Sequence, residues 1–447
     1  MMGFEFATYC NNYLHQQGLA TRSISKIDSN PAKSKHLETA TTKLFDQEID
    51  FCNLRTEVYT EDSRIPTAVT FGTPTEDAYR RDITINSLFY NINTNTVEDF
   101  TNQGLPDLSK GLIRTPLAPY ETFRDDPLRV LRCIRFGSRF GFEMVSELSE
   151  AAKDRTIKDA LVNKISRERI GTEIDKMLSG PSPLLSLQLI HQYGLYATVF
   201  EAPEIVSQPP EDAWQAVRAV GVVQWLLQEG ATSPLRQITS KDERRTIYLA
   251  ASLLPYLSVM SELKKRPIYA VQLVLRDSLK LNNHDINTIS TLFRGIPTFQ
   301  QAVQRLDEQH SLSRSELGML IRDIGSLWQT CLKMALVHDL LSLQPSITWD
   351  RPEKLDTLLG PAEEVVRRYH QLLDHAIKYS IQDAHIWKPM IDGKKITQLL
   401  DLKPGPVVQQ LLRVMMIWQL EHPEGTVDDC ATMMKQYWVQ NSARHQS

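Results

Sequence analysis

Several features are scarce in this 447-residue chain. Glycine occurs only 19 times, which argues against a fold built mainly of tight β-turns. No apolar run approaches the roughly 18 residues that a membrane-spanning helix requires. The net charge of −4 excludes a uniformly basic nucleic-acid-binding protein. Any surface that binds RNA or DNA must therefore be a local patch.

Cysteine is also sparse, and its spacing excludes a disulfide framework. The five cysteines lie far apart, are odd in number and form no Cys-x-x-Cys pair: Cys10, Cys52, Cys133, Cys331 and Cys430. This pattern predicts reduced thiols and an intracellular protein. The residues favour none of cytoplasm, nucleus or mitochondrion, and they indicate no oligomeric state.

The β-type patterns lie in the first quarter of the chain. Extended runs at 36–45 and 47–55 predict a hairpin around Asp46 and Gln47. The polar stretch from Thr56 to Asp77 is typical of a mobile loop. Residues 84–92 predict a strand, or a short helix that leads into one.

The pattern changes to helix after Pro119. From Asp126 onward the apolar residues recur at spacings of three and four, and prolines divide the pattern into short helices. The expected fold class is therefore α+β, with a small α/β head followed by a long all-α region.

The segment from Phe123 to Phe142 carries the local positive charge. Asp125 is a good N-cap, with Asp126 and Pro127 in the first turn. At about 100° per residue, one helix face gathers four arginines: Arg129, Arg132, Arg135 and Arg139. We call these four residues the arginine face. It is either a solvated face with helical ion pairs or a surface for phosphates and bases.

Asp126 and Arg129 are one helical turn apart and project side by side. A carboxylate only accepts hydrogen bonds and a guanidinium only donates them. The pair matches a base edge that offers an amine beside a ring-nitrogen acceptor, as cytosine and adenine do. Guanine and uracil present the reverse order, so the pair could select C and A without a template.

A second polar segment occupies residues 80–90. Arg80 and Arg81 suit a triphosphate, while Asp82 or Asn86 could bond ribose hydroxyls. The alternative is a capped turn, in which Asp82 or Thr84 bonds nearby backbone amides.

Together these segments resemble one family, the class II tRNA nucleotidyltransferases or CCA-adding enzymes, with bacterial poly(A) polymerases as close relatives. Four motifs occur in the family order: Arg-Arg-Asp-x-Thr-x-Asn at 80–86, DFTNQGLPDL at 99–108, Asp-Asp-x-x-Arg at 125–129 and Ser-x-Glu-Arg-Ile-x-x-Glu at 166–173. The C-terminal pieces PMIDGKKI, LKPGP and IWQLEHPEGT are most similar to fungal members.

The resemblance implies a polymerase-β-type nucleotidyltransferase head at 1–118, a helical neck at 119–200 that binds nucleotide bases and RNA, and a helical body and tail at 201–447 that bind tRNA. It assigns nucleotide binding to six residues: Arg80, Arg81, Asp82, Asn86, Asp126 and Arg129. It assigns a hinge to Asp99 and Gly104. It places further neck and RNA-binding residues at Arg132, Arg135, Arg139, Glu168 and Arg169.

The sequence departs from the family pattern at the metal site. Nucleotidyl transfer uses Mg²⁺ held by carboxylates. The family pattern has Gly-Gly-x-x-Arg-Asp followed by Asp-x-Asp, and this chain contains neither Gly-Gly nor Asp-x-Asp. Asp50 matches the remaining carboxylate and is the single candidate catalytic and metal-binding residue. Asp46, Glu48 and Asp50 alternate along one strand, where a solvated acidic edge is the alternative. We therefore expect a head shortened at its N-terminus.

Three functions follow. The first is CCA addition to tRNA 3′ ends from CTP and ATP, with Mg²⁺ expected for the complete enzyme. The second is a catalytically inactive protein that binds tRNA and nucleotide. The third is a nucleotidyltransferase that adds poly(A) to RNA. The partners expected are tRNA, CTP and ATP, and no membrane.

Overall fold

The computed structural model describes residues 1–27, 38–60, 63–206, 209–210, 213–227, 233–309, 311–343, 348–352 and 359–445. The chain divides into two compact units. The first comprises Met1–Glu204 together with Leu273–Leu281, and the second comprises Ile205–Gln272 and Asn282–Ser447. Each unit is described by itself below.

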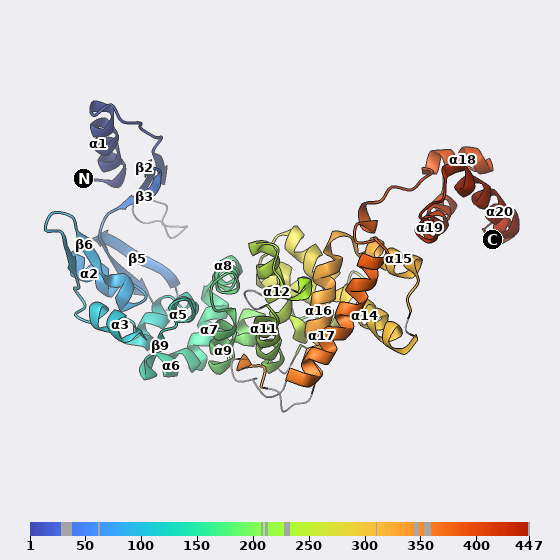
Figure 1. Cartoon of the computed structure of the whole chain (residues 1–447). Helices are drawn as coiled ribbons and strands as arrows, with labels where there is room; N and C mark the ends of the chain where they lie inside the picture. Colours follow the sequence, from blue (N-terminus) through green and yellow to red (C-terminus); the bar gives the residue numbers. More distant parts are fainter. Residues whose placement is uncertain are drawn as a thin grey trace. The chain divides into compact units, whose positions relative to one another are not determined.

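The first unit begins with a helix packed on a small antiparallel sheet (Figure 1). Its elements are α1 (Gly3–Gln16), β1 (Ser25–Ile27), β2 (Thr39–Leu44) and β3 (Gln47–Cys52), in the sheet order β1-β2-β3. The hairpin predicted around Asp46 is confirmed. Phe45 and Asp46 both have positive φ angles, 49° and 64°, as a tight two-residue hairpin turn requires.

The prediction of a mobile loop over 56–77 is wrong. Strands β4 (Arg55–Thr60) and β5 (Ser63–Phe71) form a second antiparallel hairpin, with Thr56 opposite Thr70. The register shifts between Val58 and Thr60. Both strands of a two-stranded ladder are edge strands, where a proline such as Pro66, which cannot donate a backbone hydrogen bond, is tolerated. Residues 61–62 lie outside the described residues.

The segment that carries the first motif follows directly. Thr73 and Glu76 form a capping box at the start of α2 (Pro74–Tyr79). A single 3₁₀ turn, η2, covers Thr84–Ser87, and it leads into strand β6, as the sequence predicts. The remaining elements of this region are β6 (Phe89–Asn91), β7 (Thr96–Glu98), α3 (Gly104–Lys110), β8 (Leu112–Ile113) and, parallel to β8, β9 (Glu143–Met144).

Helices make up the rest of the first unit. They are α4 (Pro119–Asp125), α5 (Leu128–Phe140), α6 (Ser146–Lys153), α7 (Arg155–Lys164), α8 (Arg167–Leu178), α9 (Pro183–Gln192), α10 (Tyr196–Val199) and the π-turn η5 (Val274–Ser278). The predicted N-cap Asp125 instead ends α4. Pro127 is the N-cap of α5, and Oδ1 of the preceding Asp126 accepts a hydrogen bond from the amide of Leu128 at 3.2 Å. Gly141, at a φ of 68°, ends α5.

The second unit is mainly helical, with one short hairpin, β10 (Met260–Leu263) and β11 (Arg266–Tyr269). Long helices α14 and α16 pack side by side, and α17 packs on both. The elements are α11 (Trp214–Leu226), η3 (Pro234–Arg236), α12 (Lys241–Ser252), η4 (Leu254–Tyr256), α13 (Ala270–Leu273), α14 (Asn283–Gln309), α15 (Arg314–Ile324), η6 (Gly325–Leu327), α16 (Trp328–Leu341), α17 (Leu359–Lys378) and η8 (Ala384–Ile386).

The last three helices, α18 (Gly393–Leu400), α19 (Pro406–Glu421) and α20 (Val427–His445), share a small apolar core.

The element order confirms the α+β fold class, with the strands concentrated before residue 145. Across the described residues, no helix has both the length and the apolar character of a membrane span. The boundaries of head, neck and body near 118 and 200 stay a prediction.

Candidate nucleotide-binding site

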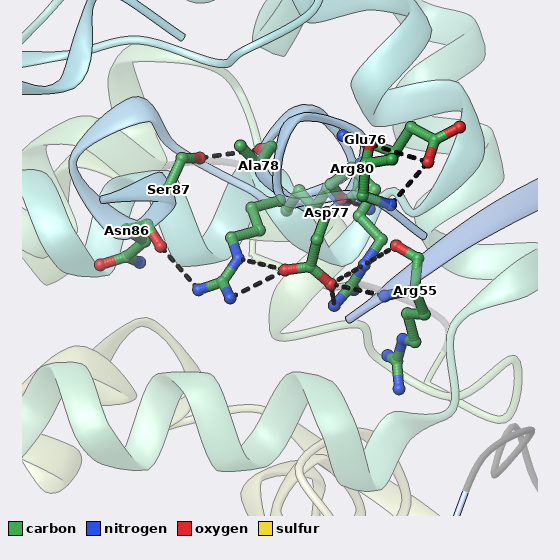
Figure 2. Close-up of polar contacts among 10 residues, drawn as sticks. Arg55, Glu76, Asp77, Ala78, Arg80, Asn86 and Ser87 are labelled. Atoms are coloured by element: carbon green, nitrogen blue, oxygen red, sulfur yellow. Dashed lines mark hydrogen bonds and ion pairs between the residues drawn. The ribbon is translucent and has the colours of Figure 1, made fainter. Parts of the chain in front are cut away.

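A single buried carboxylate holds both arginines of the predicted triphosphate segment (Figure 2). Asp77 accepts hydrogen bonds from Nε and Nη2 of Arg80 at 2.9 and 2.5 Å, and from Nε and Nη2 of Arg81 at 3.0 and 2.8 Å. The backbone amide of Arg55 also donates to it, at 3.1 Å. Sequence reasoning missed Asp77. Its position three and four residues before the two arginines was the available signal.

The Asp77 carboxyl is ionised at neutral pH. Burial by itself would raise its pKa, but the hydrogen bonds from Arg80, from the Arg55 amide and from Arg81 lower it. Two guanidinium charges therefore face one carboxylate, and the net charge of the three groups is positive. The Arg81 side chain stays one-third exposed and lies over the ring of Phe89 at 4.8 Å. This arrangement suits a partly exposed polyphosphate.

Asp82 is fully engaged within the protein. Its Oδ1 accepts hydrogen bonds from the Ile83 amide at 2.9 Å and from Nδ2 of Asn86 at 3.2 Å. Its Oδ2 accepts from Nε and Nη2 of Arg132 at 2.8 and 2.7 Å. These four donors fill the roughly four acceptor sites of a carboxylate. In this arrangement the predicted ribose contact suits the side-chain oxygen of Asn86 better than it suits Asp82.

The two residues of the predicted base-reading pair keep hydrogen-bonding capacity. Asp126 accepts hydrogen bonds from Arg169 at 2.9 Å (Nη2 to Oδ2) and 3.4 Å (Nη1 to Oδ1), and also the bond from the Leu128 amide. Three of its roughly four acceptor sites are thus used. Arg129, 8% exposed, donates one N–H to the carbonyl of Arg80 at 2.6 Å. That bond joins Arg129 to the Arg80–Asn86 segment.

Much of the arginine face is an internal ionic layer, so neither a solvated face nor an open phosphate-binding surface describes the buried Arg129 and Arg135. Arg135 is 8% exposed and donates through Nε to the buried Glu173 at 2.5 Å. Arg132 bridges Asp82 and, at 3.9 Å, the same Glu173. Burial alone would lower the pKa of Arg132, but Asp82 and Glu173 raise it. Of the four arginines, Arg139 alone is exposed.

Helix α8 supplies partners for this layer. Arg169 orients Asp126, and Glu173 meets the arginine face, in line with a neck-stabilising role. Glu168 is exposed, and its backbone carbonyl accepts a bond from Thr172. Arg167, which sequence reasoning overlooked, donates to the carbonyls of Thr198, Val199 and Ser278.

The predicted hinge residues hold a compact turn. Asp99 accepts hydrogen bonds from the Thr101 amide and hydroxyl and from the Leu105 amide. Burial would raise the pKa of Asp99, but these bonds lower it. Gly104 leaves no room for a side chain, since a Cβ there would lie 2.8 Å from the carbonyl oxygen of Thr84. Motion about these residues stays a prediction.

The described residues do not fit a catalytic Mg²⁺. No group of three or more His, Cys, Asp or Glu side chains that could hold a metal ion occurs among them. Asp50 is exposed on β3 and accepts a hydrogen bond from Thr41 at 2.5 Å. Asp46 lies in the hairpin turn and pairs with Arg22 at 3.7 Å. Asp50 by itself cannot form a Mg²⁺ site, because Mg²⁺ needs several convergent oxygen ligands.

Comparisons with known proteins agree with the geometry. A family profile described as "Poly A polymerase head domain" matches residues 1–114. A second, described as "Probable RNA and SrmB-binding site of polymerase A", matches residues 141–208. The protein named "CCA tRNA nucleotidyltransferase, mitochondrial" of Candida glabrata is 37% identical over 97% of this chain and 85% of its own length. Its namesake in Saccharomyces cerevisiae is 37% identical over 97% of this chain and 83% of its own length.

The chain belongs to the CCA tRNA nucleotidyltransferase family. Solved structures of CCA-adding enzymes share the fold of this family member. The Thermotoga maritima enzyme complexed with tRNA has a TM-score of 0.55 at 19% identity, over 98% of this chain and 85% of that one. The Bacillus stearothermophilus enzyme in complex with CTP has a TM-score of 0.56 at 18% identity, over 91% of this chain and 82% of that one.

Proposed function

We propose that this protein acts in tRNA 3′-end maturation, as a CCA-adding nucleotidyltransferase whose described residues select CTP and ATP and bind tRNA. The single observation that carries the proposal is the bond from Arg129 to the Arg80 carbonyl, which joins the predicted base-reading arginine to the Arg80–Asn86 segment. This contact supports a site in which one nucleotide reaches both segments.

The division of labour follows from hydrogen-bonding capacity. The remaining acceptor site of Asp126 would take the exocyclic amine of cytosine or adenine, and the remaining donors of Arg129 would meet the ring nitrogen. With guanine or uracil, a ring N–H would face the Arg129 donors and a carbonyl oxygen would face the Asp126 carboxylate, so neither hydrogen bond could form. Asn86 would bond a ribose hydroxyl. Arg81 and Arg80, both held by Asp77, would bind the triphosphate. Helical neck, body and tail would hold the tRNA through shape and phosphate contacts.

The transfer step itself calls for metal ligands that the described residues do not provide. Mg²⁺ dependence is expected of the complete family enzyme. For the 447-residue chain, the absence of Gly-Gly and Asp-x-Asp from the sequence favours a second function, namely binding of tRNA and nucleotide without transfer.

Two assays separate these functions. Filter binding should detect salt-sensitive affinity for tRNA that lacks its terminal CCA, and competition should rank CTP and ATP above GTP and UTP. Extension of the same tRNA with Mg²⁺ then measures transfer directly, and binding without any product would favour the binding-only function. Robust incorporation of C, C and A would reject the binding-only function. Incorporation of A alone would favour poly(A) addition instead.

The base-reading assignment has its own test. Asp126→Ala or Arg129→Ala should abolish the preference for CTP over UTP while retaining affinity for tRNA. An unchanged preference in both variants would contradict the assignment.

A further inference from the structure

A polar cavity lies at the far end of the arginine face from Asp126. It has a volume of about 570 Å³ and is bounded by α5, the C-terminal turn of α8 and the connection to α9. Its walls are formed by nine residues: Arg135, Ser138, Arg139, Lys176, Met177, Ser179, Gly180, Pro181 and Ser182. Three of these residues are cationic and none is acidic, so the cavity attracts anions.

The three cations contribute unequally. Arg135 is buried and paired with Glu173, which neutralises most of its charge locally. Lys176 is half exposed and lies 3.8 Å from the same Glu173. Arg139 is exposed. One buried carboxylate thus offsets three cations, and the excess positive charge lies at the open rim, on Arg139 and Lys176.

The start of α9 adds polar donors to the same cavity. Ser182 occupies the N-cap position of this ten-residue helix, but its side chain forms no capping hydrogen bond. The N-terminal end of a helix carries partial positive charge; because Pro183 at the first position of α9 has no N–H, this end contributes to the cavity through its dipole. Ser179 and Ser182 bring hydroxyl groups to the wall as well. Cations and hydroxyl groups together are the donor set that binds phosphate.

The position of the cavity favours a phosphate of RNA over a free anion. Arg129 and Arg139 are ten residues apart on α5, about 15 Å at a rise of 1.5 Å per residue. At about 3.4 Å per nucleotide, the rise of a stacked duplex strand, that distance corresponds to at most roughly four nucleotides. The walls from α8 and the start of α9 also fall inside the segment that matches the RNA-binding profile.

We propose that this cavity, with Arg139 and Lys176 at its rim, binds a backbone phosphate of the RNA substrate several nucleotides from the base-reading pair. The inference rests on the proposed function, since it takes the RNA to be the strand whose 3′ end lies at Asp126 and Arg129. It adds a phosphate site that reads no sequence and fixes the position of the RNA along the neck.

The test compares two double variants of the full chain. R139Q/K176Q removes the rim charges, and K110Q/R155Q removes two exposed charges from α3 and α7 as the matched control. Affinity for tRNA lacking CCA is measured across a salt series, and affinity for CTP and for inorganic pyrophosphate is measured in parallel. Circular dichroism and thermal melting confirm that both variants fold.

The pocket variant should bind tRNA about tenfold more weakly and lower the slope of log K against log salt by about 1 to 2. Its affinity for CTP should stay within about twofold of the unaltered protein, and the control should change little. Equal losses of tRNA affinity in the two variants would overturn the inference, as would a loss of pyrophosphate affinity with unchanged tRNA affinity.

The same measurements separate the two proposals. If the unaltered protein binds CTP and UTP equally while R139Q/K176Q still loses tRNA affinity, the proposed function fails and the phosphate site stands. If the unaltered protein prefers CTP and binds tRNA while R139Q/K176Q changes neither, the phosphate site fails alone.

Discussion

Individual carboxylates decide what each arginine of the site can do. Asp77, Asp82 and Glu173 are each nearly inaccessible to solvent, and each accepts charge-assisted hydrogen bonds from one or two guanidinium groups. A buried carboxylate without its charged partner destabilises the folded state, so each acid retains its arginine. The acids therefore fix the arginine positions before any nucleotide binds. The site is therefore organised in advance by acids that need not touch the substrate.

Asp77→Asn tests this organisation directly. Loss of the charged partner should weaken CTP and ATP binding about tenfold and destabilise the first unit by about 2 kcal/mol, the scale of a charge-assisted hydrogen bond. Competition binding and thermal melting measure the two effects. D77E, which keeps the charge, should recover part of the nucleotide affinity, whereas a purely steric role would leave D77E no better than D77N.

The same residue predicts a pH dependence. The folded-state pKa of Asp77 is lowered, so its stabilising contribution is present above the unfolded value of about 3.9 and is lost as the pH falls through the folded value. Melting temperatures measured from pH 6 downward should therefore fall more steeply for the unaltered protein than for D77N. Parallel curves would show that Asp77 is not the titrating group.

Arg169 is a positioning residue for base selection. Its two bonds hold the Asp126 carboxylate in one orientation. R169Q should reduce the preference for CTP over UTP about tenfold, with little change in melting temperature, because the ion pair is partly exposed. The exposed Arg155 on α7 offers the matched control R155Q, which should leave the preference unchanged.

At the scale of elements, close helix packing constrains where side chains fit. Gly171 in α8 faces the segment after η5, and a Cβ there would lie 1.9 Å from the carbonyl oxygen of Leu279. The two segments are distant in sequence but belong to the same compact unit. The glycine therefore permits an approach that no other residue allows.

Gly171→Ala should destabilise the first unit by about 3 kcal/mol, because the backbone must move apart to admit the methyl group. Gly360 in α17 provides the opposite case. It is exposed, and a Cβ there meets nothing within 4 Å. Gly360→Ala should change the stability by no more than about 0.5 kcal/mol, because the residue lies in the first turn of α17 and precedes Pro361, so helix propensity contributes little there. Calorimetry that resolves two unfolding transitions would measure both, and equal effects would contradict the packing argument.

For the whole molecule, a net charge of −4 must coexist with RNA binding. Affinity that comes from a local cationic surface is governed by counterion release rather than by net charge. The plot of log K against log salt for tRNA should therefore be linear with a clearly negative slope. A flat plot would show that phosphate contacts do not provide the affinity.

The sequence alone determined the features that act within a few residues. The hairpin at Asp46 and the helical character after Pro119 follow from turn chemistry and apolar spacing. The β4–β5 hairpin was missed because its polar, proline-containing sequence carries little alternation, and its strands are held by backbone pairing.

Tertiary structure alone decided which charges meet. Arg132 lies 50 residues from Asp82 and Arg135 lies 38 residues from Glu173, so no local pattern could show that these arginines are buried in ion pairs. An arginine face has the same spacing whether it meets water, RNA or carboxylates. Folding determines its environment, because only the packed helices bring the acids close enough to replace hydration of the guanidinium groups.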